Sequence, residues 1–166
     1  MAGIVGLTEL QHQNGTSAMT VDASGRVLMP NQPYFEVTMA DNANYPTRSA
    51  GTAFAFNSAR VNRGGHFNTT TYRFTAPIAG IYLFTASFIT NDSTPTGRIM
   101  FYVNGNSSYN GIRHGINGSN TGGGGGTNSV ATIQLEANDY VDVRSQSGST
   151  QFYESSHSSF TGILLG

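Results

Sequence analysis

The 166-residue chain contains no cysteine, no lysine and no tryptophan, and only 10% of its residues are charged. Without cysteine, the fold can use neither disulfides nor thiolate metal sites. The net charge is −1 and the eight basic residues, all arginines, form no block, so nucleic acid is not an expected partner. The longest mostly apolar run, residues 78–89, is too short to cross a bilayer, so we expect no membrane insertion. The first residues lack a basic region, which argues against a secretory signal.

Helix signals are weak along the whole chain, and strand signals are frequent. Only Leu7–Gln13 is predicted to form a turn or two of helix, which Asn14-Gly15 would end. The remaining apolar segments recur about every 8–12 residues, which is typical of a β-sandwich or jelly roll. The predicted strands are Met19–Asp22, Arg26–Met29, Tyr34–Met39, Gly51–Phe56, Tyr72–Phe74, Gly80–Thr90, Gly97–Val103, Ser129–Leu135, Tyr140–Ser145 and Ser159–Leu165.

Two turns can be predicted from their residues. Asn104-Gly105 follows an apolar strand and is a strong signal for a type I′ hairpin turn. Ala137-Asn138-Asp139 joins two segments with alternating apolar side chains, and that alternation places Gln134 and Asp142 on outward faces.

The strand predicted at Gly80–Thr90 is apolar on both of its faces. A strand exposed to water on one face alternates apolar and polar side chains, so this one needs a core on one side and a second hydrophobic surface on the other. Another subunit would supply that second surface. The two rows are Tyr82, Phe84 and Phe88 on one face and Ile81, Leu83 and Ile89 on the other.

The same part of the chain carries a spaced pattern of aromatic, asparagine and glycine residues: Phe56, Asn62, Phe67, Phe74, Gly80, Tyr82 and Phe84. This pattern resembles the globular head of complement C1q and its relatives in the tumour-necrosis-factor-like superfamily, although Ala86 replaces the last aromatic residue of the family pattern. Ser129–Val143 resembles the family's strand, tight turn, strand hairpin, and Ser159–Leu165 resembles its last strand.

The resemblance covers residues 33–166 and implies a fold and an assembly. The implied fold is an all-β jelly-roll sandwich, and the implied assembly is a homotrimer. In this interpretation a set of aromatic side chains forms the core or the trimer contacts: Phe74, Tyr82, Phe84, Phe88 and Phe160.

Residues 1–32 differ in character from the rest of the chain. Ala18–Pro30 is predicted to form a small hairpin around Asp22-Ala23-Ser24-Gly25. A two-stranded ribbon is marginally stable alone, so it must lie against another surface. The segment resembles the part that leads into such heads in bacteriophage tail-fibre and virion structural proteins. That resemblance implies attachment to other virion proteins, for which the candidate residues are Leu7, Leu10, Val21 and Leu28.

No arrangement of residues indicates catalysis, a cofactor or a bound metal. The four histidines have no metal-ligand or catalytic neighbours, and the few carboxylates form no oxygen cluster of the kind that binds calcium. The glycine run at residues 122–126 lacks the lysine and the serine or threonine of a phosphate-binding loop. We therefore predict no catalytic residue, no metal site and no cofactor.

The candidate ligand-binding residues lie in a long polar segment, Asn104–Asn128, which is predicted to be a loop. Tyr109, Arg113 and His114 within it are the residue types that adaptable binding surfaces use, and Tyr109 could stack on a sugar ring. A solvated loop with an incidental aromatic residue explains the segment equally well. Ser145–Ser159 is a second candidate edge.

Taken together, these observations predict a non-enzymatic bacteriophage virion structural protein. The trimer would be a fibre tip, spike or capsid fibre on the virion surface, and it would contact a host-surface glycan or protein. Two alternatives remain open at this point: a capsid decoration or cement protein without a host ligand, and a free lectin-like binding protein. An enzyme is the least favoured class, because no two polar groups can be named as acid and base.

Overall fold

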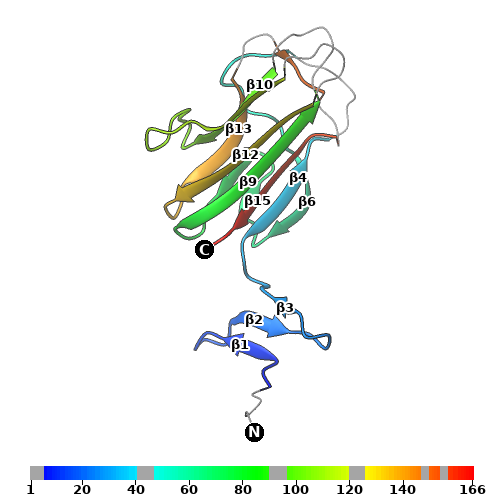
Figure 1. Ribbon diagram of the computed structural model, residues 1–166, viewed down its shortest axis with the longest axis vertical. Helices are drawn as coiled ribbons and strands as arrows, with labels where there is room; N and C mark the ends of the chain where they lie inside the picture. Colours follow the sequence, from blue (N-terminus) through cyan, green and yellow to red (C-terminus); the bar gives the residue numbers. More distant parts are fainter. Residues whose placement is uncertain (1–5, 41–46, 90–96, 120–125, 147–149, 154–156) are drawn as a thin grey trace. The chain divides into compact units, whose positions relative to one another are not determined.

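The computed structural model describes residues 6–40, 47–89, 97–119, 126–146, 150–153 and 157–166. The chain divides into two compact units, Met1–Gln32 and Pro33–Gly166, which we describe separately. The described residues form β-strands and turns (Figure 1). Among them, no helix is long and apolar enough to cross a membrane.

The first unit is a three-stranded antiparallel sheet in the order β1-β2-β3. The strands are β1 (Glu9–Gln11), β2 (Ser17–Val21) and β3 (Val27–Leu28). Asp22 holds the β2–β3 turn, because its carboxylate accepts hydrogen bonds from the amides of Ser24 and Arg26 at 2.9 and 3.0 Å. The helical turn expected at 7–13 is wrong: β1 pairs with β2 instead, and Asn14-Gly15 lies in the turn that joins them.

The second unit, which we call the head, is a sandwich of two five-stranded antiparallel sheets. The first sheet has the order β12-β9-β15-β4-β6, and its strands lie side by side in Figure 1. The second sheet has the order β11-β10-β13-β8-β7. This arrangement confirms the predicted all-β jelly-roll sandwich.

The strands of the first sheet are β4 (Tyr34–Thr38), β6 (Ser58–Arg63), β9 (Gly80–Ile89), β12 (Gly126–Leu135) and β15 (Ser159–Leu164). Those of the second are β7 (Phe67–Asn68), β8 (Arg73–Thr75), β10 (Gly97–Val103), β11 (His114–Ser119) and β13 (Tyr140–Ser145). A short additional pair consists of β5 (Thr47–Arg48) and β14 (Thr150–Gln151).

Two predicted segments differ from the structure. Gly51–Phe56 is not a regular strand; only Ala53 forms a bridge, to Arg144, and the amide of Phe54 donates to the carbonyl of Val143 at 3.0 Å. The loop predicted at Asn104–Asn128 contains all of β11 and the start of β12. β11 and the first residues of β12 are rich in glycine, asparagine and serine, so the apolar alternation there is too weak to reveal a strand.

Both predicted turns exist, but the two strands that the second turn joins do not pair with each other. Asn104 and Gly105 both have positive φ, 53° and 77°, as a type I′ turn requires. The turn at Ala137–Asp139 also exists, with Asn138 at φ 74°. However, β12 and β13 belong to opposite sheets, so the expected hairpin is wrong. Their apolar side chains face the same core from its two sides.

Asp142 lies on the outer face of β13, as the alternation predicted, but its side chain is fully buried. Its outward position therefore does not expose it to solvent. Arg73 and Arg144 bind its carboxylate from neighbouring positions on the same face and exclude water from it. Gln134, in contrast, is exposed as predicted.

The core between the sheets is built largely from phenylalanine. All ten phenylalanines of the chain are buried. Phe35 of β4 lies at the centre of this cluster, with ring centroids 5.0 Å from Phe67 and Phe74 of the second sheet and 4.8 Å from Phe160 of its own sheet. Stacked and edge-to-face aromatic pairs therefore connect the two sheets.

Gly162 of β15 is the position where this packing leaves no room for a side chain. A Cβ atom there would lie 2.8 Å from Cε1 of Phe84 and closer still to the ring of Phe35. Gly126, in β12 of the same sheet, has only the carbonyl oxygen of Phe88 nearby, at 3.8 Å from such an atom. The two glycines therefore form a matched pair for a test of core packing.

We expect Gly162→Ala to lower the free energy of unfolding by about 1–3 kcal/mol, because the methyl group forces the phenylalanine rings apart. Gly126→Ala should change it by less than about 0.5 kcal/mol. Urea unfolding of the two variants measures both values. Equal stability of the two variants would contradict the proposed packing.

Candidate functional site

The outer face of the first sheet carries an exposed aliphatic patch. We call it the apolar face; its members are Ile81 and Leu83 of β9, Val130 of β12, Ile163 of β15 and the adjacent Leu165. Strand register makes the patch continuous, because Leu83 lies opposite Ile163 and Thr85 lies opposite Val130. Ile81, Val130 and Leu165 keep 48%, 63% and 54% of their surface exposed. Contiguous patches of this kind usually mark an interface.

The five aromatic residues singled out from the sequence lie elsewhere. Phe74, Tyr82, Phe84, Phe88 and Phe160 are all buried in the core of the sandwich. None of these five aromatic side chains is therefore available for a contact with another subunit. The aromatic row of β9 faces the second sheet, and the aliphatic row of Ile81 and Leu83 is the one that faces outward.

Polar groups next to the apolar face hydrogen-bond to each other. The hydroxyls of Thr85 and Thr161 are 2.6 Å apart, and those of Ser87 and Ser159 are 2.8 Å apart. Burial of a polar group is costly when it has no hydrogen-bond partner. Because these hydroxyls are already paired across β9 and β15, a partner surface could cover them without leaving them unsatisfied.

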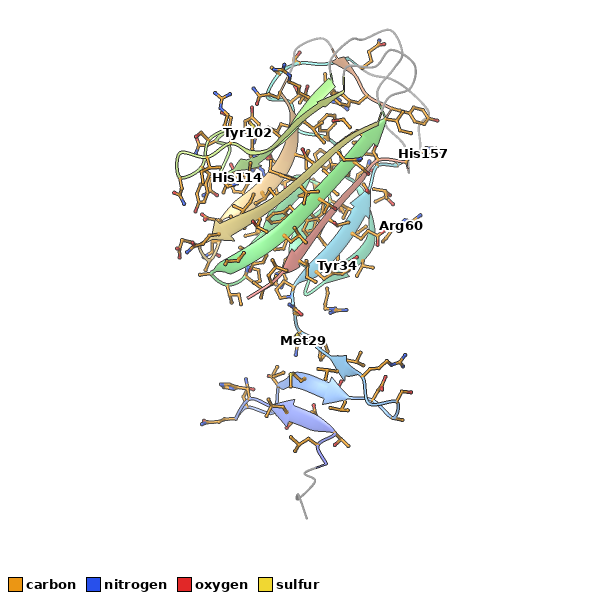
Figure 2. All side chains as sticks on the ribbon, viewed as in Figure 1. Met29, Tyr34, Arg60, Tyr102, His114 and His157 are labelled. Atoms are coloured by element: carbon orange, nitrogen blue, oxygen red, sulfur yellow. The ribbon has the colours of Figure 1, made fainter. Side chains whose placement is uncertain are left out.

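A second candidate site is a cavity beside the segment between β10 and β11. It has a volume of about 240 Å³. Tyr109 and His114 lie together here, with ring centroids 6.4 Å apart, and His114 is labelled in Figure 2. Arg113, the third predicted ligand residue, is exposed and is not among the lining residues. The cavity is lined by Tyr109, Asn110, Ile112, His114, Thr132 and Gln134.

Asp139 fixes one wall of this cavity. Its carboxylate accepts hydrogen bonds from the hydroxyl of Tyr109 and the amide group of Asn104, both at 2.6 Å, and from the backbone amide of Glu136 at 2.9 Å. The Tyr109 hydroxyl is therefore already engaged, although the tyrosine ring still lines the cavity. Sequence reasoning missed Thr132 and Gln134, because their polar side chains on β12 look like any solvated strand face.

The ionisable groups around the cavity have shifted pKa values. The hydrogen bond to Asp139, with burial, raises the pKa of Tyr109 to about 12. Burial lowers the pKa of His114, so its imidazole is neutral at pH 7. For Asp139, burial alone acts to raise the pKa, but the donors from Tyr109, Asn104 and Glu136 outweigh it and lower the pKa overall. Near neutral pH the cavity thus contains a neutral imidazole and a neutral phenol.

The candidate attachment residues of the first unit are mostly exposed. Leu7, Leu10 and Leu28 are exposed, and Val21 is half-buried. Val27 and Met29, which sequence reasoning did not single out, are also exposed. A sheet of three short strands cannot bury all of these apolar side chains itself. Among the residues that the structure describes, no group of three or more histidines or carboxylates could hold a metal ion.

Comparison with solved structures identifies the class of the head. It is similar to the globular domain of zebrafish complement 1qA (TM-score 0.63, 16% identity, 81% of this chain and 98% of that one). It is also similar to Eiger TNF from S. frugiperda (TM-score 0.64, 13% identity, 82% of this chain and 94% of that one). Murine APRIL is a third similar structure (TM-score 0.61, 12% identity, 81% of this chain and 99% of that one). These likenesses establish a jelly roll of the C1q and tumour-necrosis-factor type.

Sequence comparison identifies the family to which the chain belongs. The C1q domain model matches residues 35–165, and the chain belongs to the C1q domain family. Human complement C1q tumor necrosis factor-related protein 3 is 27% identical over 110 residues, and so is the mouse protein of the same name. The match covers 66% of this chain and 43% of each relative, so the chain spans less than half of their length.

The lowered pKa of Asp139 predicts how the cavity wall responds to acid. Folding lowers the pKa of this carboxylate, so its full contribution to stability is present when the pH is above the pKa of the unfolded chain, near 3.8. That contribution is lost as the pH falls through the lower pKa of the folded protein. We expect an NMR titration of the Asp139 carboxyl to give a midpoint below 3.8. Tyr109→Phe removes one donor and should move the midpoint upward, whereas Tyr34→Phe on the first sheet should not. A wild-type midpoint at or above 3.8 would contradict the assigned hydrogen bonds.

Proposed function

We propose that this protein is a non-enzymatic structural protein of a bacteriophage virion, in which the head forms a homotrimer on the particle surface. The observation that carries the proposal is the apolar face of the first sheet, which a second copy of the chain would cover. Residues 1–32 would attach the trimer to other virion proteins. The head would contact a host-surface glycan or protein as a fibre tip, spike or capsid fibre.

Trimer formation is supported by the chemistry of the apolar face. Its members are aliphatic, the hydroxyls next to it are paired, and the chain has few charges to oppose association. A cyclic trimer uses one surface patch against a different patch of the next copy. A permanent interface of this kind buries more than about 2,000 Å² in total. Membership of the C1q domain family, whose domains typically form homotrimers, is consistent with this assembly.

A charge placed on the apolar face tests the trimer directly. Ile81→Asp should dissociate it, because the carboxylate would be buried without a partner at the interface. The isolated subunit should keep its fold, since Ile81 is 48% exposed. Ile78→Asp is the matched control, because Ile78 is 51% exposed and precedes β9 outside the sheet. Analytical ultracentrifugation should show a monomer for the first variant and a trimer for the second. The same mass for both variants would contradict the assignment of the trimer contact to the apolar face.

The attachment role is supported by the exposed apolar side chains of the first unit and by its resemblance to segments of phage fibre proteins. This role, and the location on the virion surface, rest on that resemblance together with Leu7, Leu10 and Leu28. Because these leucines are exposed on a small sheet, replacing them should weaken a contact with another protein without unfolding the head.

We expect Leu10→Ser combined with Leu28→Ser to reduce incorporation of the protein into particles that are assembled without it. Gln11→Ser is the control, because Gln11 is an exposed polar residue of β1. Immunoblotting of purified particles measures incorporation. If the double variant is incorporated like the wild type, residues 1–32 do not attach the head through these leucines. If the wild-type protein binds no particle, a free lectin-like role replaces the virion role.

Ligand binding is assigned to the cavity beside Tyr109. Its size and its lining of an aromatic ring, amides, a hydroxyl and a neutral imidazole suit one or two neutral sugar residues rather than a charged group. A decoration protein without a host ligand would have no use for such a site. Non-enzymatic action agrees with the relatives named above, which are a complement component and tumour-necrosis-factor-type proteins.

A further inference from the structure

The outer face of the second sheet carries a cluster of charged and aromatic side chains. Tyr102 of β10 lies opposite Asp142 of β13, and the register of β13 with β8 places Arg73 on the other side of Asp142. Tyr140 and Arg144 flank Asp142 on the same face of β13, two residues away in each direction. Figure 2 labels Tyr102. The cluster belongs to the sheet opposite the apolar face and shares no residue with it.

Arg144 neutralises the buried carboxylate of Asp142. Its Nε atom is 2.6 Å from Oδ1 and its Nη2 atom is 2.8 Å from Oδ2, which is the two-pronged geometry of a strong arginine–carboxylate pair. The guanidinium carbon also lies 4.7 Å from the ring centroid of Tyr102. Only 17% of the Arg144 side chain is exposed. The charge of Asp142 is therefore balanced by this arginine.

The side chain of Arg73 is held in place, but no carboxylate of its own among the described residues balances its positive charge. A single contact joins its Nε atom to Oδ2 of Asp142, at 3.3 Å, and its guanidinium carbon lies 4.2 Å from the ring centroid of Tyr140. The side chain is 39% exposed. Within the part of the chain that the structure describes, its two terminal nitrogens have no hydrogen-bond partner. The cluster thus has one positive charge in excess, on a guanidinium fixed over an aromatic ring.

The surroundings of Arg73 indicate what kind of anion would fit. Its cross-strand neighbour Asn68 and the next outward residue of its own strand, Thr75, are both exposed and uncharged. A carboxylate matches the fork of terminal N–H groups on an arginine, and hydroxyls match amide and hydroxyl side chains. One fixed cation beside neutral hydrogen-bonding groups suits one carboxylate on a hydroxyl-rich molecule. A dense polyanion would require several cations.

We infer that Arg73 forms a subsite for the carboxylate of an acidic sugar, such as a uronic acid, on the outer face of the second sheet. Asp142 and Tyr140 act as positioning residues, because they fix the plane of the guanidinium and leave its terminal nitrogens free for the ligand. This subsite is separate from the cavity beside Tyr109 and depends neither on that cavity nor on the virion role.

The experiment follows the Nε–Hε resonance of Arg73 by NMR while trigalacturonic acid is added to the full chain. We expect this resonance to shift in a saturable way. Arg73→Gln should weaken binding at least about tenfold, since the charge-assisted contact is lost. Arg60→Gln, which removes an exposed arginine of β6 in the first sheet, should leave the affinity unchanged.

Several results would overturn the inference. One is an Arg73 resonance that does not respond to trigalacturonic acid, and this outcome can be read from the wild-type protein even if Arg73→Gln fails to fold. Another is undiminished binding by a folded Arg73→Gln variant. Equal binding of neutral galactose trisaccharide would exclude the carboxylate as the recognised group, and equal or tighter binding of an aspartate-rich peptide would exclude the sugar.

Discussion

The packing of phenylalanine between the two sheets is the interaction on which the rest of the structure depends. The chain has no cysteine, so no disulfide can hold the sheets together. Phe35 instead contacts rings of both sheets, and Phe54 and Phe152 extend the cluster from segments outside the two sheets, with centroids 4.8 Å apart. Gly162 lets the Phe35 ring approach the backbone of β15 closely. The positions of the outward-facing residues follow from this inward packing, since neighbours along a strand point to opposite faces.

Because the aromatic side chains point into the core, the residues between them along each strand form the outer faces of the two sheets. On β9 the inward positions take Tyr82, Phe84 and Phe88, and the outward ones include Ile81 and Leu83. The first sheet is therefore apolar on both faces near this strand, which is what a subunit interface requires. The second sheet carries its polar cluster on its outer face instead. The two outer faces thus differ in chemistry, and we propose self-association for the apolar face and a carboxylate subsite for the face that carries Arg73.

Sequence reasoning was most reliable where apolar alternation was strong. The strands at Tyr34–Thr38, Gly80–Ile89 and Tyr140–Ser145 were predicted nearly to the residue, and the resemblance to C1q heads is confirmed by the family match and by the fold. It failed where strands are polar. β11 and β6 contain glycine, asparagine, serine and arginine, and they lie at the edges of their sheets, where no apolar pattern is needed.

The polar sites were harder to predict because their partners are distant in sequence. Asp139 binds Asn104 and Tyr109, thirty or more residues away, and Asp142 binds Arg73 across 69 residues. A single sequence gives no sign of such pairs. One local signal did exist: Tyr140, Asp142 and Arg144 alternate on one face of β13, which brings opposite charges and an aromatic ring together.

The proposed trimer requires another copy of the chain to cover the apolar face. The most direct test is the mass of the unmodified protein in solution, measured by multi-angle light scattering over a range of concentrations. A permanent trimer has a mass three times that of the 17.6 kDa chain, unchanged on dilution. A stable monomer would contradict the proposed trimer, because Ile81, Val130 and Leu165 would then remain exposed to water without a partner.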